Sequence, residues 1–186
     1  AARMEEAIAV AGAAASQITV GDPNGNSLLG PVVSEVQFNK IQKLIQSGID
    51  EGATLVAGGV GRPEGLDKGY YVKPTVFANV TPEMTISKEE IFGPVLSILG
   101  YENVDQAIQI GNDTEYGLAA YVQAADLAKA REVASKLRAG QVSINGGGGD
   151  LMAPFGGYKM SGNGREWGDF AFNEFLEVKA VLGYAP

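Results

Sequence analysis

The most restrictive feature of the chain is a regular alternation of short apolar runs with segments of helical periodicity. Apolar runs that predict strands lie at residues 53–57, 72–80, 95–99, 118–122 and 142–144, and helical patterns lie at 104–110 and 125–139. Strands joined through helices form a sheet with helices on its faces, because each helix returns the chain to the same end of the sheet. The sequence therefore predicts an α/β fold with a largely parallel sheet.

Two further helices are predicted before the first strand. The first of them has Met4, Ala7, Ile8, Ala11 and Ala15 along one face. The second begins with a capping box, in which the Ser34 hydroxyl accepts from the amide of Gln37 and the Gln37 side chain reaches back. Gly52 ends this helix, whose apolar face holds Phe38, Ile41, Leu44, Ile45 and Ile49.

The second half of the chain adds a glycine-rich loop and a terminal strand. Eight of the 26 glycines, at positions 146, 147, 148, 149, 156, 157, 162 and 164, let the backbone approach a ligand or a neighbouring strand closely. Residues 174–186 alternate in polarity and predict a half-buried strand, with Leu176, Val178, Ala180 and Leu182 on its apolar face. No internal repeat or break divides the chain, so we expect a single domain over residues 1–186.

Composition excludes several classes of function. The chain has no cysteine and no histidine, which excludes disulfide scaffolds, thiol nucleophiles, zinc fingers and Ser-His-Asp triads, and we expect no metal site. Its 22 acidic and 14 basic residues leave a net charge of −8, which argues against a nucleic-acid partner. Neither a membrane-spanning stretch nor a signal peptide is visible, so we expect no membrane partner and a cytoplasmic location. The chain begins at Ala1 without a methionine, and we expect it to be a piece of a longer protein.

Residues 87–94 form the first motif with chemical potential. Their order, Ser-Lys-Glu-Glu-Ile-Phe-Gly-Pro, predicts one helical turn that Ser87 caps, with Glu90 at its third position and a Gly-Pro pair at its end. Two interpretations of Glu90 stay open: its carboxylate completes the capping box, or it points into a cleft and accepts both hydroxyls of a vicinal diol such as ribose. Phe92 correspondingly packs in the core or against a flat ring. No window has the spacing of a glycine-rich dinucleotide fingerprint or a phosphate-binding loop.

Residues 153–168 form the second motif. They predict an ordered loop that fixes bulky aromatic side chains between glycines and leads to a capped helix. Phe155 and Trp167 are core residues or ligand contacts, and Arg165 forms a solvated or structural charge pair with Glu166.

The two motifs, in this order, resemble the aldehyde dehydrogenase superfamily. The residues that carry the resemblance are Glu89-Glu90-Ile91-Phe92-Gly93-Pro94 and the run 154–166, Pro-Phe-Gly-Gly-Tyr-Lys-x-Ser-Gly-x-Gly-Arg-Glu, with Val20-Gly21-Asp22-Pro23 upstream and Glu177-Val178-Lys179 at the end. The resemblance covers essentially all of the chain and corresponds to the carboxyl-terminal part of the catalytic domain. It implies a three-layer αβα sandwich, in which residues 174–186 are the terminal strand of the oligomerisation region and the parent enzyme is a dimer or tetramer.

The resemblance also implies a reaction and a cofactor site. The parent enzyme would oxidise an aldehyde to a carboxylic acid with NAD or NADP, through a thioester on a cysteine. Glu90 matches the glutamate that binds the nicotinamide ribose, and Phe92 matches the aromatic residue beside it. Gln37 and Lys40 match positions that reach the same ribose.

The aldehyde pocket is implied by fewer residues. Phe155 matches an aromatic residue that lines the pocket, and Asn145 matches a structural asparagine near it. Gly149 belongs to the pocket as well, at the end of a run of four glycines that replaces the bulkier residues of many members. This replacement leaves the preferred aldehyde open.

The chain also departs from the family. The nucleophilic cysteine, the activating glutamate and the nucleotide-binding domain would precede it, and so would the residue that separates NAD from NADP. We therefore expect no catalytic residue in this chain, no cofactor bound to it alone and no activity of the isolated chain. Two alternatives stay open: a scaffold or oligomerisation module that kept the fold without the chemistry, and a relative that transfers the acyl group to coenzyme A.

Overall fold

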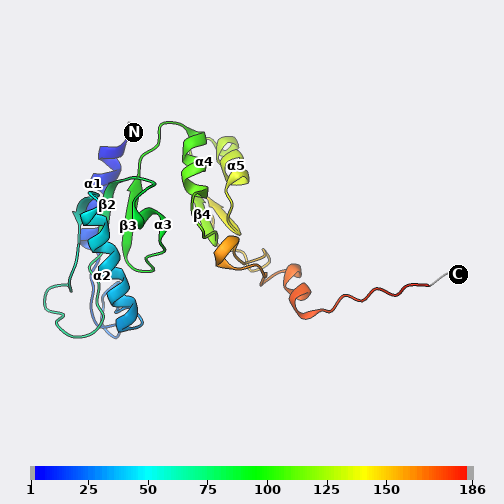
Figure 1. Ribbon diagram of the computed structural model, residues 1–186, viewed down its shortest axis with the longest axis horizontal. Coiled ribbons are helices and arrows are strands. Elements are labelled where there is room, and N and C mark those ends of the chain that lie inside the picture. Colours follow the sequence, from blue (N-terminus) through cyan, green and yellow to red (C-terminus); the bar gives the residue numbers. More distant parts are fainter. Residues whose placement is uncertain (1–2, 184–186) are drawn as a thin grey trace. The chain divides into compact units, whose positions relative to one another are not determined.

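The computed structural model describes residues 3–183, and Figure 1 shows the course of the chain. The chain divides into two compact units, unit 1 up to Thr114 and unit 2 from Glu115, and each is described by itself. Whether the two units together form the predicted single domain over residues 1–186 depends on how they associate, so the single domain stays a prediction.

Unit 1 contains the first seven helices and strands. In chain order they are α1 Met4–Gln17, α2 Glu35–Asp50, β1 Thr54–Ala57, β2 Thr75–Val80, α3 Thr85–Lys88, β3 Val95–Leu99 and α4 Val104–Asn112 (Figure 1). Strand β2 lies between β1 and β3, antiparallel to the first and parallel to the second.

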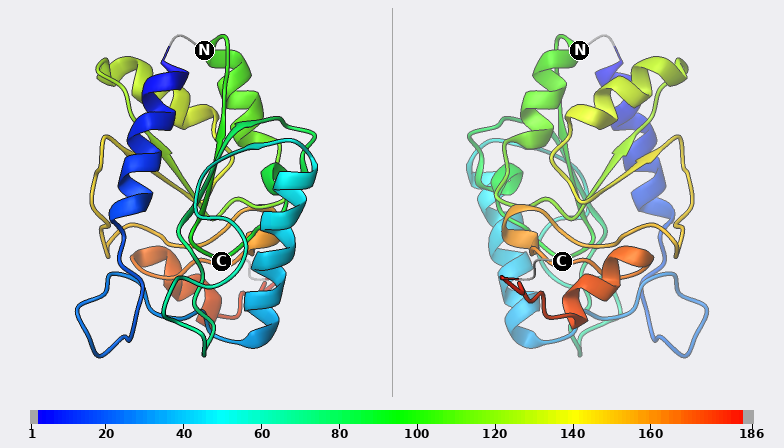
Figure 2. Two further views of the ribbon diagram at one scale, coloured as in Figure 1. Left: turned by 90° about the vertical axis from the view of Figure 1, so that its left-hand side faces the viewer. Right: turned by 90° about the vertical axis from the view of Figure 1, so that its right-hand side faces the viewer.

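Helices cover both faces of this sheet. The Phe77 ring of β2 reaches α2 at Gly48, whereas Val56 of β1 reaches α1 at Gly12. Figure 2 accordingly shows α1 and α2 on opposite sides of the strands. Because neither face of β2 meets solvent, residues 75–78 are all buried and their sequence does not alternate in polarity.

The larger part of the core lies between α2 and the sheet. It consists of Phe38, Ile41, Leu44, Ile45, Ala53, Val72, Phe77, Val80, Ile86 and Ile91. The predicted apolar face of α2 is therefore confirmed, with Ile49 packed at its margin. Each large apolar side chain buried here stabilises the fold by about 2 kcal/mol, which makes α2 a firmly held element.

Unit 2 is built on one βαβ unit. It contains β4 Ala119–Val122, α5 Leu127–Lys136 and β5 Gln141–Ile144, followed by short 3₁₀ helices at Lys159–Ser161 and Asp169–Phe175. The two strands are parallel, from Ala119 opposite Gln141 to Val122 opposite Ile144, and α5 packs against both. The helix predicted to follow the second motif is the 3₁₀ turn that begins at Asp169, and no side chain caps it.

The α/β class is confirmed, and so is the order of the predicted elements up to Ile144, while the described sheets are small and mixed. One sheet has three strands and the other has two, and the β1–β2 pair is antiparallel. Residues 58–74 join β1 to β2 without a helix. A connection of this kind allows antiparallel pairing, whereas a helical crossover leads back to a parallel neighbour.

The last described residues form no strand. Residues 176–183 run as irregular chain without strand pairing, and residues 184–186 of the predicted strand at 174–186 lie outside the described part. A strand needs a partner that accepts and donates its backbone hydrogen bonds, so the oligomerisation strand stays a prediction. None of the helices within residues 3–183 is both long enough and apolar enough to cross a membrane.

Candidate functional site

The amino end of α2 is capped by one half of the predicted capping box. The Ser34 hydroxyl accepts a hydrogen bond of 3.2 Å from the amide of Gln37, as predicted. The other half of the prediction is wrong, because the Gln37 side chain does not return to Ser34. It donates instead to the carbonyl oxygens of Ile91 at 2.9 Å and Phe92 at 3.0 Å, which lie more than 50 residues further along the chain.

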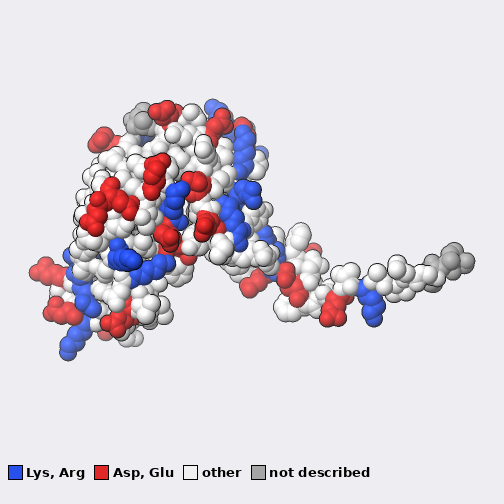
Figure 3. All heavy atoms as spheres, in the orientation of Figure 1, with Lys and Arg blue, Asp and Glu red and all other residues white. Residues whose placement is uncertain are grey.

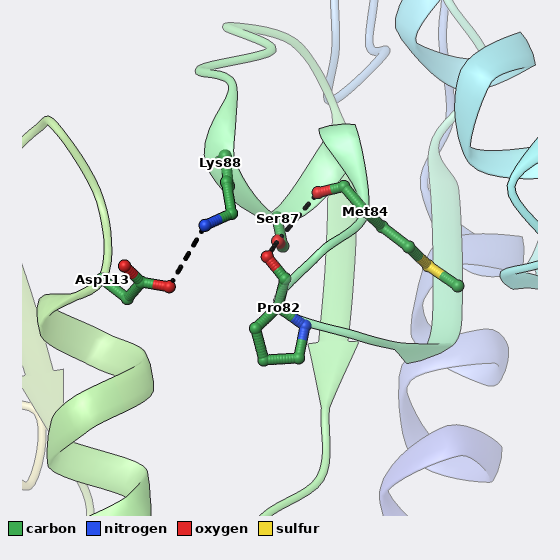
Figure 4. A network of polar contacts seen from close by, with 5 residues as sticks. All are labelled: Pro82, Met84, Ser87, Lys88 and Asp113. Atoms are coloured by element: carbon green, nitrogen blue, oxygen red, sulfur yellow. Dashed lines mark hydrogen bonds and ion pairs between the residues drawn. The ribbon is translucent and has the colours of Figure 1, made fainter.

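The helical turn of the first motif lies earlier than predicted. Helix α3 spans Thr85–Lys88, so Ser87 is inside the turn and Glu90 lies beyond it. The Ser87 hydroxyl is 2.9 Å from the Met84 carbonyl oxygen and 3.0 Å from that of Pro82, and Lys88 pairs with Asp113 at 3.3 Å (Figure 4). Ser87 is therefore a donor here, and the capping interpretation of Glu90 is wrong.

The amide of Thr85 in this turn is bound by a residue from another element. Glu51, which directly follows α2, accepts from the Thr85 amide and from the Thr85 hydroxyl, both at 2.6 Å. It also accepts from Ser47 at 2.7 Å. Hydrogen bonding by the Thr85 hydroxyl, then by Ser47 and the Thr85 amide, lowers the pKa of Glu51 from its ordinary value. No local pattern in the sequence indicates this contact.

Residues 91–93 lie against α2 with Ile91 buried and the next two residues exposed. Ile91 is buried in the core, and Gly93 passes so close to α2 that a Cβ there would lie 2.6 Å from Ile41. Phe92 lies between them with 72% of its surface exposed and a left-handed φ of 57°. The core alternative for Phe92 is thus wrong, and the exposed ring is available to a flat partner.

Lys40 completes the support of this loop. Its ammonium group donates to the Glu90 carbonyl oxygen at 2.7 Å. The structure thus brings together Gln37, Lys40, Glu90 and Phe92, which the sequence places in two separate segments. The contacts of Gln37 and Lys40 run to the loop backbone, which sequence reasoning did not predict.

The Glu90 side chain is free to bind a ligand. It is exposed, and no residue within 3–183 forms a hydrogen bond or ion pair with its carboxylate. An ionised carboxylate accepts hydrogen bonds through both oxygens, so it suits a pair of adjacent hydroxyl groups. A hollow of about 430 Å³ adjoins the same loop at Gly93 and Pro94. The described residues contain no cluster of carboxylates that would hold a metal ion. Figure 3 shows acidic and basic side chains interspersed over unit 1.

The second motif forms a compact loop in unit 2. Phe155 and Glu166 exchange backbone hydrogen bonds of 2.8 and 2.7 Å, which places the Phe155 ring 4.9 Å from that of Trp167. Trp167 keeps 40% of its surface exposed, and the two rings line a pocket of about 620 Å³ together with Arg165 and Glu174.

Several glycines of unit 2 serve backbone packing. A Cβ at Gly140 would overlap the carbonyl oxygen of Gly156, and a Cβ at Gly156 would overlap that of Gly164. The Arg165 guanidinium bonds to the carbonyl oxygens of Gly157 at 3.0 Å and Gly164 at 2.7 Å. Arg165 is therefore a structural charge that holds the loop through its backbone, and the close approach predicted from the glycines is to neighbouring backbone.

Asn145 and Gly149 lie at the carboxyl end of β5. The Asn145 side chain accepts from the amide of Ala124 and donates to its carbonyl oxygen, both at 2.9 Å, while its own amide donates to Val122. It has a left-handed φ of 51° and joins the ends of the two strands. Gly149 is exposed, with no atom within 4 Å of the position that its Cβ would occupy. Larger side chains thus have space at this position.

Comparison with known proteins connects this geometry to one family. Residues 2–181 match the aldehyde dehydrogenase family. A 3-succinoylsemialdehyde-pyridine dehydrogenase from a Pseudomonas species is 53% identical over 169 residues, which are 90% of this chain and 35% of that protein.

Solved structures of the family have the same fold. Aldehyde dehydrogenase C from Pseudomonas syringae, a cysteine-to-alanine mutant in complex with NAD⁺ and octanal, is 52% identical and superimposes with a TM-score of 0.94 over 99% of this chain and 38% of its own. A Mycobacterium tuberculosis aldehyde dehydrogenase complexed with NAD⁺ is 43% identical, with a TM-score of 0.90 over 100% of this chain and 39% of its own. The chain thus spans somewhat more than a third of the length of these relatives.

Proposed function

Because this chain belongs to the aldehyde dehydrogenase family, we propose that it forms part of an NAD(P)-dependent enzyme that oxidises an aldehyde to a carboxylic acid through a thioester. Within that enzyme, unit 1 binds the nicotinamide end of the cofactor and unit 2 contributes to the aldehyde pocket. The observation that carries the proposal is the loop of unit 1, which exposes Glu90 and Phe92 from a backbone fixed by α2.

The residues present fit a nicotinamide ribose. The Glu90 carboxylate has both oxygens available for the two ribose hydroxyls, and the exposed Phe92 ring offers an apolar surface beside them. Gln37 and Lys40 belong to the same site, where their side chains donate to the backbone of the loop that presents Glu90 and Phe92. Bound NAD(P) supplies the hydride acceptor of the reaction.

In unit 2 we assign Phe155 and Gly149 to the aldehyde pocket and Asn145 to its support. The Phe155 ring lies in a largely apolar pocket, which suits a hydrophobic aldehyde chain. Asn145 holds the end of β5 through three hydrogen bonds, so the glycines that follow start from a fixed point.

The chemistry of this proposal needs a thiol that the chain does not contain. With no cysteine in 186 residues, this part binds and orients, and we propose that it has no dehydrogenase activity when isolated. We further propose that the whole enzyme has the three-layer αβα catalytic domain with a largely parallel sheet, acts in the cytoplasm, and forms a dimer or tetramer through residues 174–186.

The test is an assay of the full-length protein that carries this chain. We expect aldehyde-dependent reduction of NAD⁺ or NADP⁺ with the carboxylic acid as product, measured with a series of aldehydes of increasing length. Formation of an acyl-coenzyme A in the presence of coenzyme A would show the acylating reaction instead. A full-length protein that binds neither dinucleotide would contradict the proposal, and turnover by the isolated chain would contradict its inactivity.

A further inference from the structure

We propose that Gln37 and Lys40 are positioning residues, which act on the cofactor site by fixing the backbone of residues 90–92. This inference rests on the function proposed above, since it concerns the loop that presents Glu90 and Phe92. It differs from the expectation that the two side chains serve the ribose directly.

The Gln37 amide group is bound to two consecutive peptide groups. The Ile91 carbonyl oxygen belongs to the peptide that precedes Phe92, and the Phe92 carbonyl oxygen belongs to the peptide that follows it. One NH₂ group reaches both, at 2.9 and 3.0 Å. The rotations of these two peptide planes about the Phe92 Cα are φ and ψ, so one side chain holds both backbone angles of this residue.

Phe92 needs such support because its backbone conformation is unfavourable. A φ of 57° is left-handed, and for a residue with a bulky side chain it costs about 1–3 kcal/mol. A conformation of this kind persists only where the surroundings determine it. If the Gln37 contacts were lost, the peptide planes would relax, and both the Phe92 ring and the adjacent Glu90 would leave their positions.

The supporting side chains come from one face of a rigid helix. Gln37, Lys40 and Ile41 are spaced at i, i+3 and i+4, so they lie side by side on α2. Ile41 is fully buried and contacts Gly93, while Lys40 reaches the Glu90 carbonyl oxygen at 2.7 Å. The loop is thus fixed at three successive points, and residues placed on rigid, well-packed elements hold a site more accurately than loops do.

The decisive variant is Gln37→Glu in the full-length protein. It keeps the size of the side chain and its acceptor oxygen but replaces both donors with a charged acceptor that faces two carbonyl oxygens. If Gln37 served the ribose as an acceptor, this variant would bind the dinucleotide as well as the natural protein or more tightly. If Gln37 positions the loop, the variant loosens the loop and weakens binding.

We would measure hydrogen exchange of residues 89–93 without cofactor, and dissociation constants of NAD⁺ and NADP⁺ by titration. For Gln37→Glu we expect exchange in this segment to rise about tenfold or more, with peptides of α5 unchanged, and affinity to fall about tenfold, as loss of two hydrogen bonds predicts. Lys40→Met should raise the exchange and lower the affinity by smaller factors. Lys40→Arg keeps a donor at this position, so its exchange and affinity should stay close to those of the natural protein. Gln46→Glu and Lys43→Met, on the exposed side of α2, serve as matched controls that leave both measurements unchanged.

The exchange measurement separates the two proposals. Unchanged exchange at residues 89–93 in Gln37→Glu would overturn the positioning role, whatever the cofactor affinity. A natural protein that binds neither NAD⁺ nor NADP⁺ would overturn the proposed function, while increased exchange in the variant would still support the role of Gln37 in holding the loop.

Discussion

At the scale of single residues, neighbouring side chains with the same chemistry have different tasks. Glu89 and Glu90 are adjacent and exposed, and Glu89 directly follows α3, with its amide bonded to the Thr85 carbonyl oxygen. Glu90 lies one residue further, where Lys40 fixes its carbonyl oxygen and leaves the carboxylate available. This difference makes the pair a natural test of the cofactor site.

We predict that Glu90→Gln in the full-length enzyme slows hydride transfer by about 10–100-fold, because hydrogen bonds to a charged acceptor contribute about 1.5–3 kcal/mol. Single-turnover formation of the reduced dinucleotide measures this step. An amide does not ionise, so the deficit should persist as the pH is raised. Glu89→Gln is the control and should keep the natural rate, whereas a natural rate in Glu90→Gln would exclude Glu90 from the site.

Two glycines of unit 2 provide a matched pair for stability. A Cβ at Gly140 would overlap the Gly156 carbonyl oxygen, but a Cβ at Gly148 would meet no atom within 4 Å. We predict that Gly140→Ala lowers the free energy of unfolding by about 2–3 kcal/mol, as overpacking of a backbone contact does, and that Gly148→Ala changes it by less than about 0.5 kcal/mol. Urea denaturation measures both. Equal midpoints for the two variants would contradict the close packing at Gly140.

At the scale of elements, α2 organises the segment that carries the first motif. Its amino end holds residues 90–92 through Gln37 and Lys40, and Glu51 at its carboxyl end holds Thr85. Helix α3 is only one turn long, and turns of this length are not stable alone. The bound Glu51 carboxylate therefore supplies an acceptor that α3 lacks within its own sequence.

We predict that Glu51→Gln lowers the stability of unit 1 in a pH-dependent way. The pKa of Glu51 is lowered in the folded state, so its contribution is complete above the pKa of an unfolded glutamate and is lost as the pH falls through the folded value. The difference between the natural protein and the variant should therefore be largest near neutral pH, shrink once the pH falls below the pKa of an unfolded glutamate, and vanish only below the lower pKa of the folded state. Thermal unfolding across this range measures it, and Glu64→Gln, on an exposed loop, is the control. A constant difference at all pH values would show that the charge is not involved.

How well these elements could be predicted depended on how far apart in the sequence their hydrogen-bond partners lie. The start of α2 was predicted because Ser34 and the amide of Gln37 are three residues apart. The position of α3 was wrong because Glu51, the residue that binds Thr85, lies 34 residues earlier, beyond the range of any local capping rule. The predicted contact of the Gln37 side chain was wrong for the same reason, since a long-range hydrogen bond to Ile91 replaced the local one.

At the scale of the whole molecule, family membership followed from two short motifs, because residues such as Gly93 and Gly156 tolerate no side chain and therefore leave a recognisable pattern. How the two units associate, and what residues 176–183 bind, depends on surfaces that no local pattern describes. In the described part of that segment, apolar residues stand exposed: Leu176 at 62%, Val178 at 100%, Val181 at 76% and Leu182 at 90%. A group of exposed apolar side chains of this size is normally covered by a partner.

We predict that the isolated chain associates through this segment. Its backbone forms no strand pairing within residues 3–183 and its apolar side chains are exposed, and pairing with the same segment of a second copy would give both a partner. Light scattering over a hundredfold range of concentration should show a molar mass that rises with concentration. Val178→Lys should shift the chain toward monomer, because it places a charge within the paired apolar face. Val10→Lys, at an exposed position of α1, should leave the association unchanged. A natural chain that stays monomeric throughout would exclude pairing through residues 176–183.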